Sequence, residues 1–423
     1  MIESVRAIQI LDSRGNPTIE CEIVCSKGTE RASVASGAST GSFEAIELRD
    51  NEKAFRGKGV LKAVNNINKI IAPKLVKKDP SKQRELDEML VKLDGTPNKS
   101  KLGANAITAT SLAIARAGSL EKGMQLFDYI AELSGAKILY LPVPQFNVIN
   151  GGKHAGLKND PQEHMIMPIK FNTYAEALQA GCEIYYILRD LLKQKFGPRA
   201  TLLADEGGFA PPIDNVNQRL ELIEKAIEES GYSGKIFIAL DPAASEFFYK
   251  GTYVLGDAEK SPGQMVDFYE NLVKSFKIFS IEDGLAEEDW DGWVELTAKL
   301  GNKVQIVGDD LLVTNVERIR KALEIKACNA LLLKVNQIGT LSEAIDAAKL
   351  AFEHGWEVVV SHRSGETCDP FIASLVVGLG AKQCKFGAPA RAERTAKYNN
   401  LLRIEELLQE RGTAKYAGKY LKA

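Results

Sequence analysis

The sequence has few residues of the kinds that mark disulfide-stabilised, zinc-binding or nucleic-acid-binding proteins. Its 423 residues include only six cysteines, with no C-x-x-C pair, and only four histidines. We therefore interpret the cysteines as small hydrophobic side chains in a reducing compartment. The 54 basic and 56 acidic residues leave a net charge of -2, which gives no electrostatic footprint for nucleic acid. A small molecule is the expected partner.

The sequence also lacks a long apolar run. The longest stretch without a charged residue, 138–152, has fifteen residues and two prolines, which is too short to cross a bilayer. The first six residues do not have the layout of a signal peptide. We expect a cytoplasmic protein without a membrane span.

The first third of the chain is predicted to be a separate α+β domain. Three short strands are expected within residues 5–35, and the alternation of apolar and acidic residues over 19–25 predicts an antiparallel sheet with one solvated face. The alanine-rich segment 104–117 predicts a buried helix. We place the domain boundary after Gly135, which gives domains 1–135 and 136–423.

In the second domain, polar residues follow apolar runs at nearly regular intervals of 41, 27, 25, 28 and 23 residues. A spacing near 25 suits one strand and one returning helix, which predicts a β/α barrel. Side chains at the C-terminal ends of barrel strands converge on one mouth. The six residues expected there are Asp241, Glu282, Asp309, Lys334, His362 and Lys385.

Three of these six residues are carboxylates. Each alone is more simply a helix cap or part of a solvated loop, but their common placement favours a shared site. All-oxygen ligation by Asp241, Glu282 and Asp309 would leave room for water and substrate, which predicts Mg²⁺.

Lys334 has two interpretations. A lone lysine after a buried strand more often packs its stem and extends its ammonium group to solvent. A metal cluster beside it would disfavour the protonated form, so that an amine with an ordinary pKa of about 10.4 could act as a base near pH 7. The second interpretation permits removal of a weakly acidic proton next to a carboxylate.

Two polar loops supply further acids. Asp205 and Glu206 lie on a turn bracketed by glycines, which is either an ordinary acidic turn or a stiff loop that directs Glu206 into the mouth. Gln162 and Glu163 lie on a second loop, where we discount the adjacent His164 because lone histidines are usually not catalytic.

Two further loops are rich in small or donor side chains. Residues 361–365 follow an apolar strand and carry hydrogen-bond donors but no acidic side chain. An arginine beside serines and backbone amides is typical of a phosphate-binding site. Residues 36–42 are all small, which indicates either a slack linker or a lid.

The chain resembles the enolase family over essentially its whole length. The matching stretches are Asp12-Ser-Arg-Gly-Asn-Pro17, Ser36-Gly-Ala-Ser-Thr-Gly41, Leu102-Gly-Ala-Asn105, Asn147-Val-Ile-Asn-Gly-Gly-Lys-His-Ala-Gly156, Asp205-Glu-Gly-Gly208, Gly308-Asp-Asp310, Lys334-Val-Asn-Gln-Ile-Gly339 and Ser361-His-Arg-Ser-Gly-Glu-Thr367. The resemblance implies an α+β domain followed by a (β/α)8 barrel. It also implies a homo-oligomer, either a dimer or an octamer, and a hydro-lyase that interconverts 2-phospho-D-glycerate and phosphoenolpyruvate in glycolysis and gluconeogenesis.

The resemblance further implies two Mg²⁺ per site. Asp241, Glu282 and Asp309 would hold the first, and Ser39 would join the second, which arrives with substrate. Lys334 would take the C2 proton, giving an enediolate-like intermediate neutralised by the metals and Lys385.

In the family's pattern, Glu206, supported by Glu163, would protonate the departing C3 hydroxyl. The substrate-binding residues implied are His154, Gln162, Glu163, Glu282, Asp309, His362, Arg363, Ser364 and Lys385.

Two departures from the family pattern lie beside these residues. Gly284 stands where enolases usually have proline and is expected to loosen the loop behind Glu282. Phe386 is expected to change the volume beside Lys385. The alternatives are another enzyme of the superfamily, such as a racemase or cycloisomerase, and a non-catalytic binding or surface protein on the same scaffold.

Overall fold

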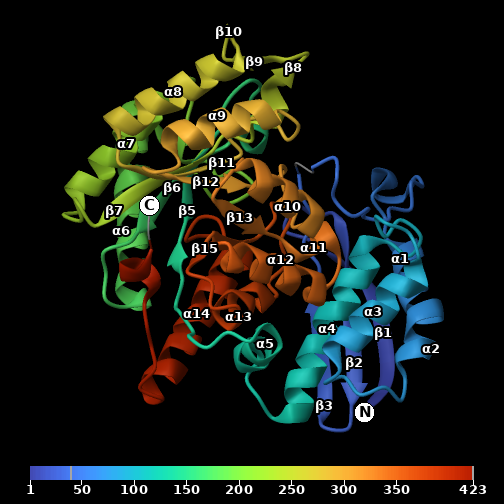
Figure 1. The fold of residues 1–423 in the computed structure, drawn as a ribbon. Helices are drawn as coiled ribbons and strands as arrows, with labels where there is room; N and C mark the ends of the chain where they lie inside the picture. The colour runs from blue at the N-terminus through green and yellow to red at the C-terminus, as the bar shows by residue number, and fades with distance from the viewer. Residues whose placement is uncertain (39–40, 422–423) are drawn as a thin grey trace.

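The computed structural model describes residues 1–38 and 41–421. Its N-terminal part contains a three-stranded antiparallel sheet in the order β1-β2-β3, as predicted (Figure 1). The strands are β1 (Ile2–Leu11), β2 (Pro17–Cys25) and β3 (Gly28–Ser33). Ile19, Cys21 and Ile23 are buried, whereas Glu20 and Glu22 between them are partly exposed. This alternation gives the sheet one face against the helices.

Some helices of the N-terminal part pack on this sheet, and others pack on those helices and on helices of the barrel. The longest, α4 (Ala104–Lys122), is buried on nearly all sides. It contacts β2 and β3 of the sheet. It also contacts the barrel, where Thr108 Oγ1 donates a 2.8 Å hydrogen bond to the carbonyl of Gly339. The other elements are η1 (Ala54–Gly57), α1 (Leu61–Asn66), η2 (Ile67–Ile71), α2 (Ala72–Leu75), α3 (Gln83–Asp94) and α5 (Leu126–Ser134).

The second part is a barrel built on a nine-stranded sheet in the order β4-β15-β14-β13-β12-β11-β7-β6-β5. Its first two strands flank Gln145: one pairs with β15 and the other with β6, so this single segment closes the ring. The strands are β4 (Val143–Pro144), β5 (Phe146–Asn150), β6 (Glu163–Pro168), β7 (Ile236–Asp241), β11 (Ile278–Glu282), β12 (Gln305–Gly308), β13 (Ala330–Leu333), β14 (Glu357–Ser361) and β15 (Gln383–Lys385).

The barrel begins irregularly and then repeats. The strand β6 runs antiparallel to both of its neighbours, whereas the pairs from β7 through β15 to β4 are parallel. The 41-residue interval that precedes Glu282 holds a small sheet of β8 (Phe248–Tyr249), β9 (Thr252–Leu255) and β10 (Ala258–Lys260) in addition to its helix. This insertion explains why that interval is longer than the others.

Helices surround the barrel (Figure 1). They are α6 (Tyr174–Phe196), α7 (Val216–Glu229), α8 (Pro262–Ser275), α9 (Trp290–Leu300), α10 (Val316–Ile325), α12 (Leu341–Glu353), α13 (Phe371–Gly378) and α14 (Ala392–Glu410). Short helical turns are η3 (Gly152–Ala155), η4 (Pro198–Thr201), η5 (Ala244–Phe247), α11 (Val335–Ile338) and η6 (Ala417–Tyr420). Among the described helices, none has the length and apolar character needed to cross a membrane.

The N-terminal sheet meets the barrel at its mouth. The turn after β1 reaches the loop after β14, where the Ser13 amide donates a 2.7 Å hydrogen bond to the Glu366 carbonyl. A Cβ at Gly365 would lie 2.5 Å from side-chain atoms of Asp12 and Arg14, so a larger residue here would force these side chains to shift. The contact brings the segment after β3 to the edge of the mouth.

Candidate active site

The six residues predicted at strand ends all lie at the C-terminal ends of parallel barrel strands, either as the last strand residue or directly after it. One small cavity at this mouth brings together most of the predicted site. Its lining includes His154, Gln162, Glu163, Glu206, Asp241, Asp309, Lys334, His362, Arg363, Ser364 and Lys385. Glu282 is buried directly beside it, and Ser39 lies outside the described residues.

Lys385 joins three carboxylates at the centre of the mouth. Its ammonium nitrogen lies 2.7 Å from Asp241, 2.8 Å from Glu282 and 3.2 Å from Glu163. Burial lowers the pKa of Lys385, but these three carboxylates outweigh it and raise the pKa well above its usual range. The lysine is therefore charged, and it balances part of the negative charge that the strand ends bring together.

Lys334 makes the equivalent contact with Asp309. Its ammonium nitrogen lies 2.5 Å from Asp309 Oδ2, while the side-chain amide of Gln337 donates a 2.8 Å hydrogen bond to Oδ1. Burial lowers the pKa of Lys334, but the Asp309 charge more than offsets this and the net shift is upward. The contact with Asp309 therefore favours the protonated form of Lys334.

The residues around the two lysines fit a hard cation. Glu282 Oε2 and Glu163 Oε2 are buried without a hydrogen-bond partner, so each has a lone pair available for a ligand. Carboxylate oxygens from Asp283, Asp309 and Asp310 lie within 4.8 Å of one another. All these donors are oxygen atoms, the type that Mg²⁺ prefers.

The predicted ligand set shares only Asp309 with that close group. Asp241 and Glu282 are instead held by Lys385, and Asp309 is held by Lys334. Asp283 has a different role, because its carboxylate accepts 2.8 Å hydrogen bonds from the backbone amides of Asp309 and Asp310. It therefore fixes the strand end that carries Asp309.

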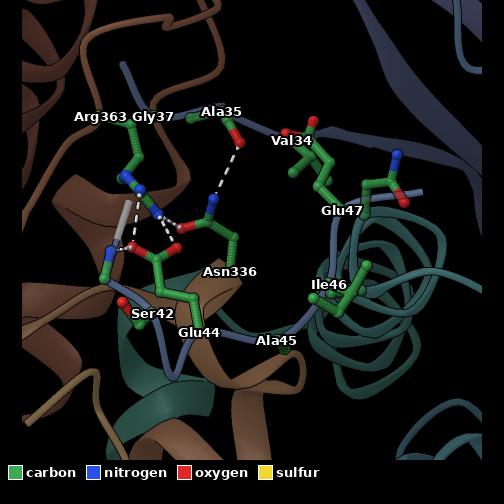
Figure 2. A pocket seen from close by; sticks show the side chains of 13 residues that line it. Val34, Ala35, Gly37, Ser42, Glu44, Ala45, Ile46, Glu47, Asn336 and Arg363 are labelled. Carbon is green, nitrogen blue, oxygen red and sulfur yellow. Dashed lines mark hydrogen bonds and ion pairs between the residues drawn. The ribbon is translucent and has the colours of Figure 1, made fainter. Parts of the chain in front are cut away.

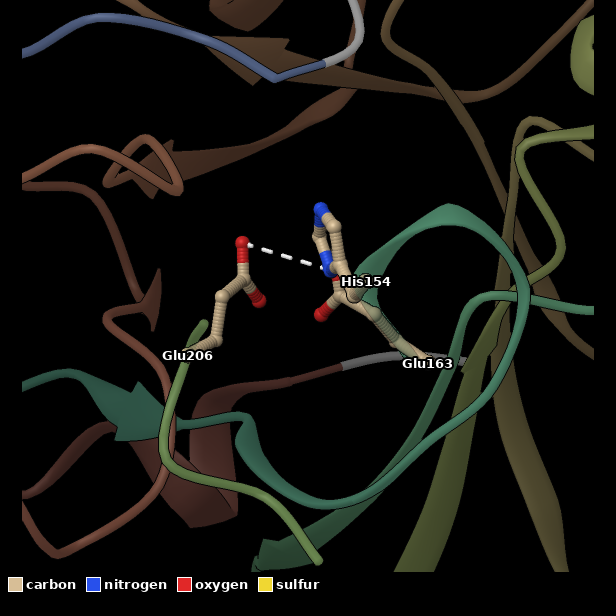
Figure 3. A group of neighbouring side chains, drawn as sticks. All are labelled: His154, Glu163 and Glu206. Carbon is tan, nitrogen blue, oxygen red and sulfur yellow. Dashed lines mark ion pairs between the residues drawn. The ribbon is translucent and has the colours of Figure 1, made fainter. Parts of the chain in front are cut away.

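A second group of acids lies on the other side of the cavity. Figure 3 shows His154, Glu163 and Glu206 converging, with His154 Nδ1 3.7 Å from Glu206 Oε1 and 3.9 Å from Glu163 Oε1. The side-chain amide of Asn147 donates a 3.0 Å hydrogen bond to Glu206. Burial and the neighbouring Glu206 charge raise the pKa of Glu163 well above its usual range. Burial also raises the pKa of Glu206, but the neighbouring His154, His362 and Arg394 outweigh it and lower the pKa well below its usual range. Of the two carboxyl groups, Glu163 therefore binds a proton more readily.

The predicted phosphate receptor is paired with a carboxylate from the N-terminal part. Arg363 forms a bidentate ion pair with Glu44, in which Nη1 and Nη2 donate to the two carboxylate oxygens at 2.9 and 3.0 Å (Figure 2). Nη1 also donates a 3.1 Å hydrogen bond to the side-chain oxygen of Asn336. Glu44 Oε1 also accepts a 3.0 Å hydrogen bond from the Gly41 amide. A cavity of about 460 Å³ opens beside this pair. The loop after β3 thus supplies the counter-charge of Arg363.

Sequence reasoning missed several residues that hold the site together. They are Glu44, Asn147, Asp283, Gln337 and Arg394. Asp283 directly follows Glu282 and was interpretable from sequence as a solvated loop. The other four residues do not follow the strand-end pattern. Each contacts a site residue that is distant in the sequence, so no local pattern indicates its role.

The structure shows how the two residues that depart from the family pattern are packed. The Gly284 carbonyl accepts a 2.8 Å hydrogen bond from the Tyr269 hydroxyl, and a Cβ at Gly284 would lie 3.2 Å from Ile281 and Leu296 side chains. The loop behind Glu282 is therefore closely packed. Phe386 is buried in the core, with its ring 6.0 Å from that of Tyr398.

Taken together, the fold and the site define a β/α-barrel enzyme of acid–base chemistry, with a lysine on one side of the mouth and a pair of carboxyl groups on the other. Comparisons with known proteins agree with this class. The family model described as "Enolase, N-terminal domain" matches residues 2–130, and "Enolase, C-terminal TIM barrel domain" matches residues 138–423. The chain belongs to the enolase family, whose members are lyases.

Curated relatives match over nearly the full length of both chains. The enolase of Methanocaldococcus jannaschii is 52% identical over 419 residues, and that of Pyrococcus furiosus is 54% identical over 422 residues. The enolase of the plant Solanum lycopersicum is 53% identical over 433 residues. Each alignment covers 99% of this chain and 97% of the relative.

Proposed function

We propose that this chain carries out the enolase reaction, the reversible dehydration of 2-phospho-D-glycerate to phosphoenolpyruvate, with Lys334 as the base and the Glu206–Glu163 pair as the acid. The observation that carries the proposal is the placement of these groups around one buried cavity on different barrel segments. This separation allows the C2 proton and the C3 hydroxyl to leave from opposite faces of the substrate.

The proton transfers follow from the local charges. Lys334 must first lose its proton and its contact with Asp309, after which the amine takes the C2 proton. On the other side, Glu206 would give a proton to the departing C3 hydroxyl, with Glu163 beside it as the carboxyl group of higher pKa. The positive Lys385 lies between the two sides and offsets negative charge on the substrate carboxylate as C2 is deprotonated.

Mg²⁺ is the proposed cofactor, with two ions per site and the second arriving with substrate. Asp241, Glu282 and Asp309 would hold the first ion, and Ser39 would contribute to the second. When bound, Mg²⁺ supplies positive charge beside the substrate carboxylate. The free oxygen of Glu282 supports this assignment.

Substrate phosphate is proposed to bind Arg363 and Ser364. A guanidinium group can contact two phosphate oxygens at once, and Arg363 already presents both of its terminal nitrogens to the Glu44 carboxylate. His154, Gln162 and His362 line the remaining wall of the cavity.

The same proposal includes a boundary between residues 135 and 136, a cytoplasmic location and a homo-oligomer that is either a dimer or an octamer. The six cysteines are all free, which supports a reducing compartment. Light scattering after gel filtration would measure the oligomeric state.

The test is a direct assay of phosphoenolpyruvate formation from 2-phospho-D-glycerate by absorbance. We expect turnover with Mg²⁺, none with a chelator, and none with Lys334→Ala. Absence of turnover by the wild-type chain with Mg²⁺ would overturn the proposal.

A further inference from the structure

Arg394 is a fully buried arginine at the start of α14 that contacts two loops of the mouth. One terminal nitrogen, Nη1, lies 2.6 Å from His362 Nδ1 and donates to the Arg363 carbonyl at 2.7 Å. The other, Nη2, donates to the Ser364 carbonyl at 2.6 Å and to the Asp205 carbonyl at 3.1 Å. The side chain therefore ties the loop after β14 to the turn that carries Glu206.

The contact with His362 determines the state of the imidazole ring. A guanidinium group has donors only and stays protonated in proteins, so His362 Nδ1 must accept the hydrogen bond. A proton on Nδ1 would direct two donors, and in the imidazolium form two positive charges, at one another over 2.6 Å. The ring is therefore neutral, and its single proton lies on Nε2.

Nε2 is the ring nitrogen nearer Glu206, the proposed acid, although it has no hydrogen-bond partner among the described residues. His362 Nε2 lies 3.4 Å from Glu206 Oε2. The charged groups around the ring are Glu206 on the turn before α7, Arg394 on α14 and Lys385 on β15. Burial, reinforced by the two cations and opposed by Glu206, lowers the pKa of His362 to about 3. A neutral ring at physiological pH is consistent with the geometry.

We propose that Arg394 is a positioning residue of the enolase reaction, which keeps His362 neutral with its proton on Nε2, so that the ring presents a donor rather than an acceptor to Glu206. The inference rests on the role of Glu206 in the proposed function. Without Arg394, an imidazolium at position 362 would form an ion pair with Glu206, and the carboxyl group would stay ionised. Glu206 would then be harder to protonate, and the departing C3 hydroxyl would lose its acid.

The tautomer can be measured without any turnover. The chain has only four histidines, so nitrogen-15 labelling of histidine gives a spectrum in which His362 is assigned by its absence from His362→Gln. We expect wild-type His362 to show a protonated Nε2 and an unprotonated, hydrogen-bonded Nδ1, without change from pH 8 to pH 5. A protonated Nδ1 at pH 7, alone or in an imidazolium, would overturn the inference.

Arg394→Met removes the donors while keeping a long side chain. We expect His362 to titrate near the ordinary pKa of about 6.5 in this variant. We also expect kcat to fall about 10- to 100-fold, within the range of lost acid–base assistance, and to fall further on the acid side of that pH. A His362 signal and a pH profile identical to the wild type would contradict the inference.

Two further variants separate this role from a structural one. Arg391→Met is the matched control, because Arg391 lies at the start of the same helix and donates to the carbonyls of Ala204 and Ser13 but not to His362. It should leave the tautomer unchanged. Arg394→Lys keeps a cationic donor and should show the wild-type tautomer, which gives a result even if Arg394→Met does not fold. If Arg394→Lys and Arg391→Met both showed an altered tautomer, the result would count against the inference.

Failure of the proposed function gives a different result. If Glu206→Gln kept full activity, the acid would be assigned wrongly, while the imidazole signals of the wild type would still decide whether Arg394 fixes the tautomer.

Discussion

The ammonium group of Lys334 lies 2.5 Å from Asp309, so the proposed base and a proposed metal ligand form an ion pair. The net upward shift of the Lys334 pKa follows from this pairing, since the Asp309 charge outweighs the effect of burial. We therefore expect binding of a cation at Asp309 to be coupled to release of the Lys334 amine.

Lys334→Met should strongly reduce turnover and tighten binding of the first Mg²⁺ at the same time. We expect kcat to fall by about 10³-fold, within the range for loss of a general base. Mg²⁺ should bind more tightly because no ammonium group competes for Asp309. Calorimetric titration of the metal measures the second effect. The control is Lys349→Met, which removes an exposed lysine on α12. Weaker metal binding by Lys334→Met would contradict the coupling.

Lys385→Met should destabilise the metal-free protein and make its stability depend on Mg²⁺. Removing the partner of buried carboxylates leaves their charge uncompensated, which costs about 3–5 kcal/mol. A divalent cation should restore part of this loss. Urea unfolding with and without Mg²⁺ measures the free energy of unfolding in each state. Equal stability of variant and wild type without metal would show that Lys385 does not balance this cluster.

Glu44→Gln should strengthen inhibition by inorganic phosphate. The Glu44 carboxylate offsets the charge of Arg363 at 2.9 and 3.0 Å, so its neutral replacement leaves more positive potential for phosphate. We expect the inhibition constant to fall about tenfold, which corresponds to about 1.4 kcal/mol. Glu47→Gln is the control, because Glu47 pairs with Arg49 at 2.6 Å. Unchanged inhibition by phosphate in Glu44→Gln would argue against this competition.

His164→Phe should reduce the loss of stability in mild acid. Burial, and then the nearby Arg219 charge, lower the pKa of His164 well below its ordinary value. The folded state therefore binds this proton less readily than the unfolded state, and stability that is present above about pH 6.5 is lost as the pH falls below it. Between pH 7.5 and 5.5 this one group costs about 1.4 kcal/mol.

Urea midpoints at these two pH values test the prediction. The wild type should lose more stability than His164→Phe, by about that amount. His354→Phe is the matched control, because His354 is exposed on the surface after α12. A pH dependence in His164→Phe equal to that of the wild type would mean that His164 does not carry the effect.

The strand-end pattern was a reliable guide to the barrel and to the mouth of the site. A polar residue directly after a buried apolar run is expected at the end of the strand. This was the expectation for Asp241, Glu282 and Lys385, and each is the last residue of its strand. The pattern could not show that Lys385 lies among carboxylates at 2.7 to 3.2 Å. That depends on which strands are neighbours around the ring.

The sequence by itself determined the order of elements, the apolar faces and the set of chemical groups delivered to the barrel mouth, because these depend on local periodicity and on the spacing of successive β/α units. Only the tertiary structure decided which charges meet. Glu44 reaches Arg363 across 319 residues, and Arg394 reaches His362 across 32, from elements whose own patterns indicate nothing more than a loop and a helix. Such contacts are fixed by packing between distant segments, where burial makes every unpaired charge costly and so selects one arrangement.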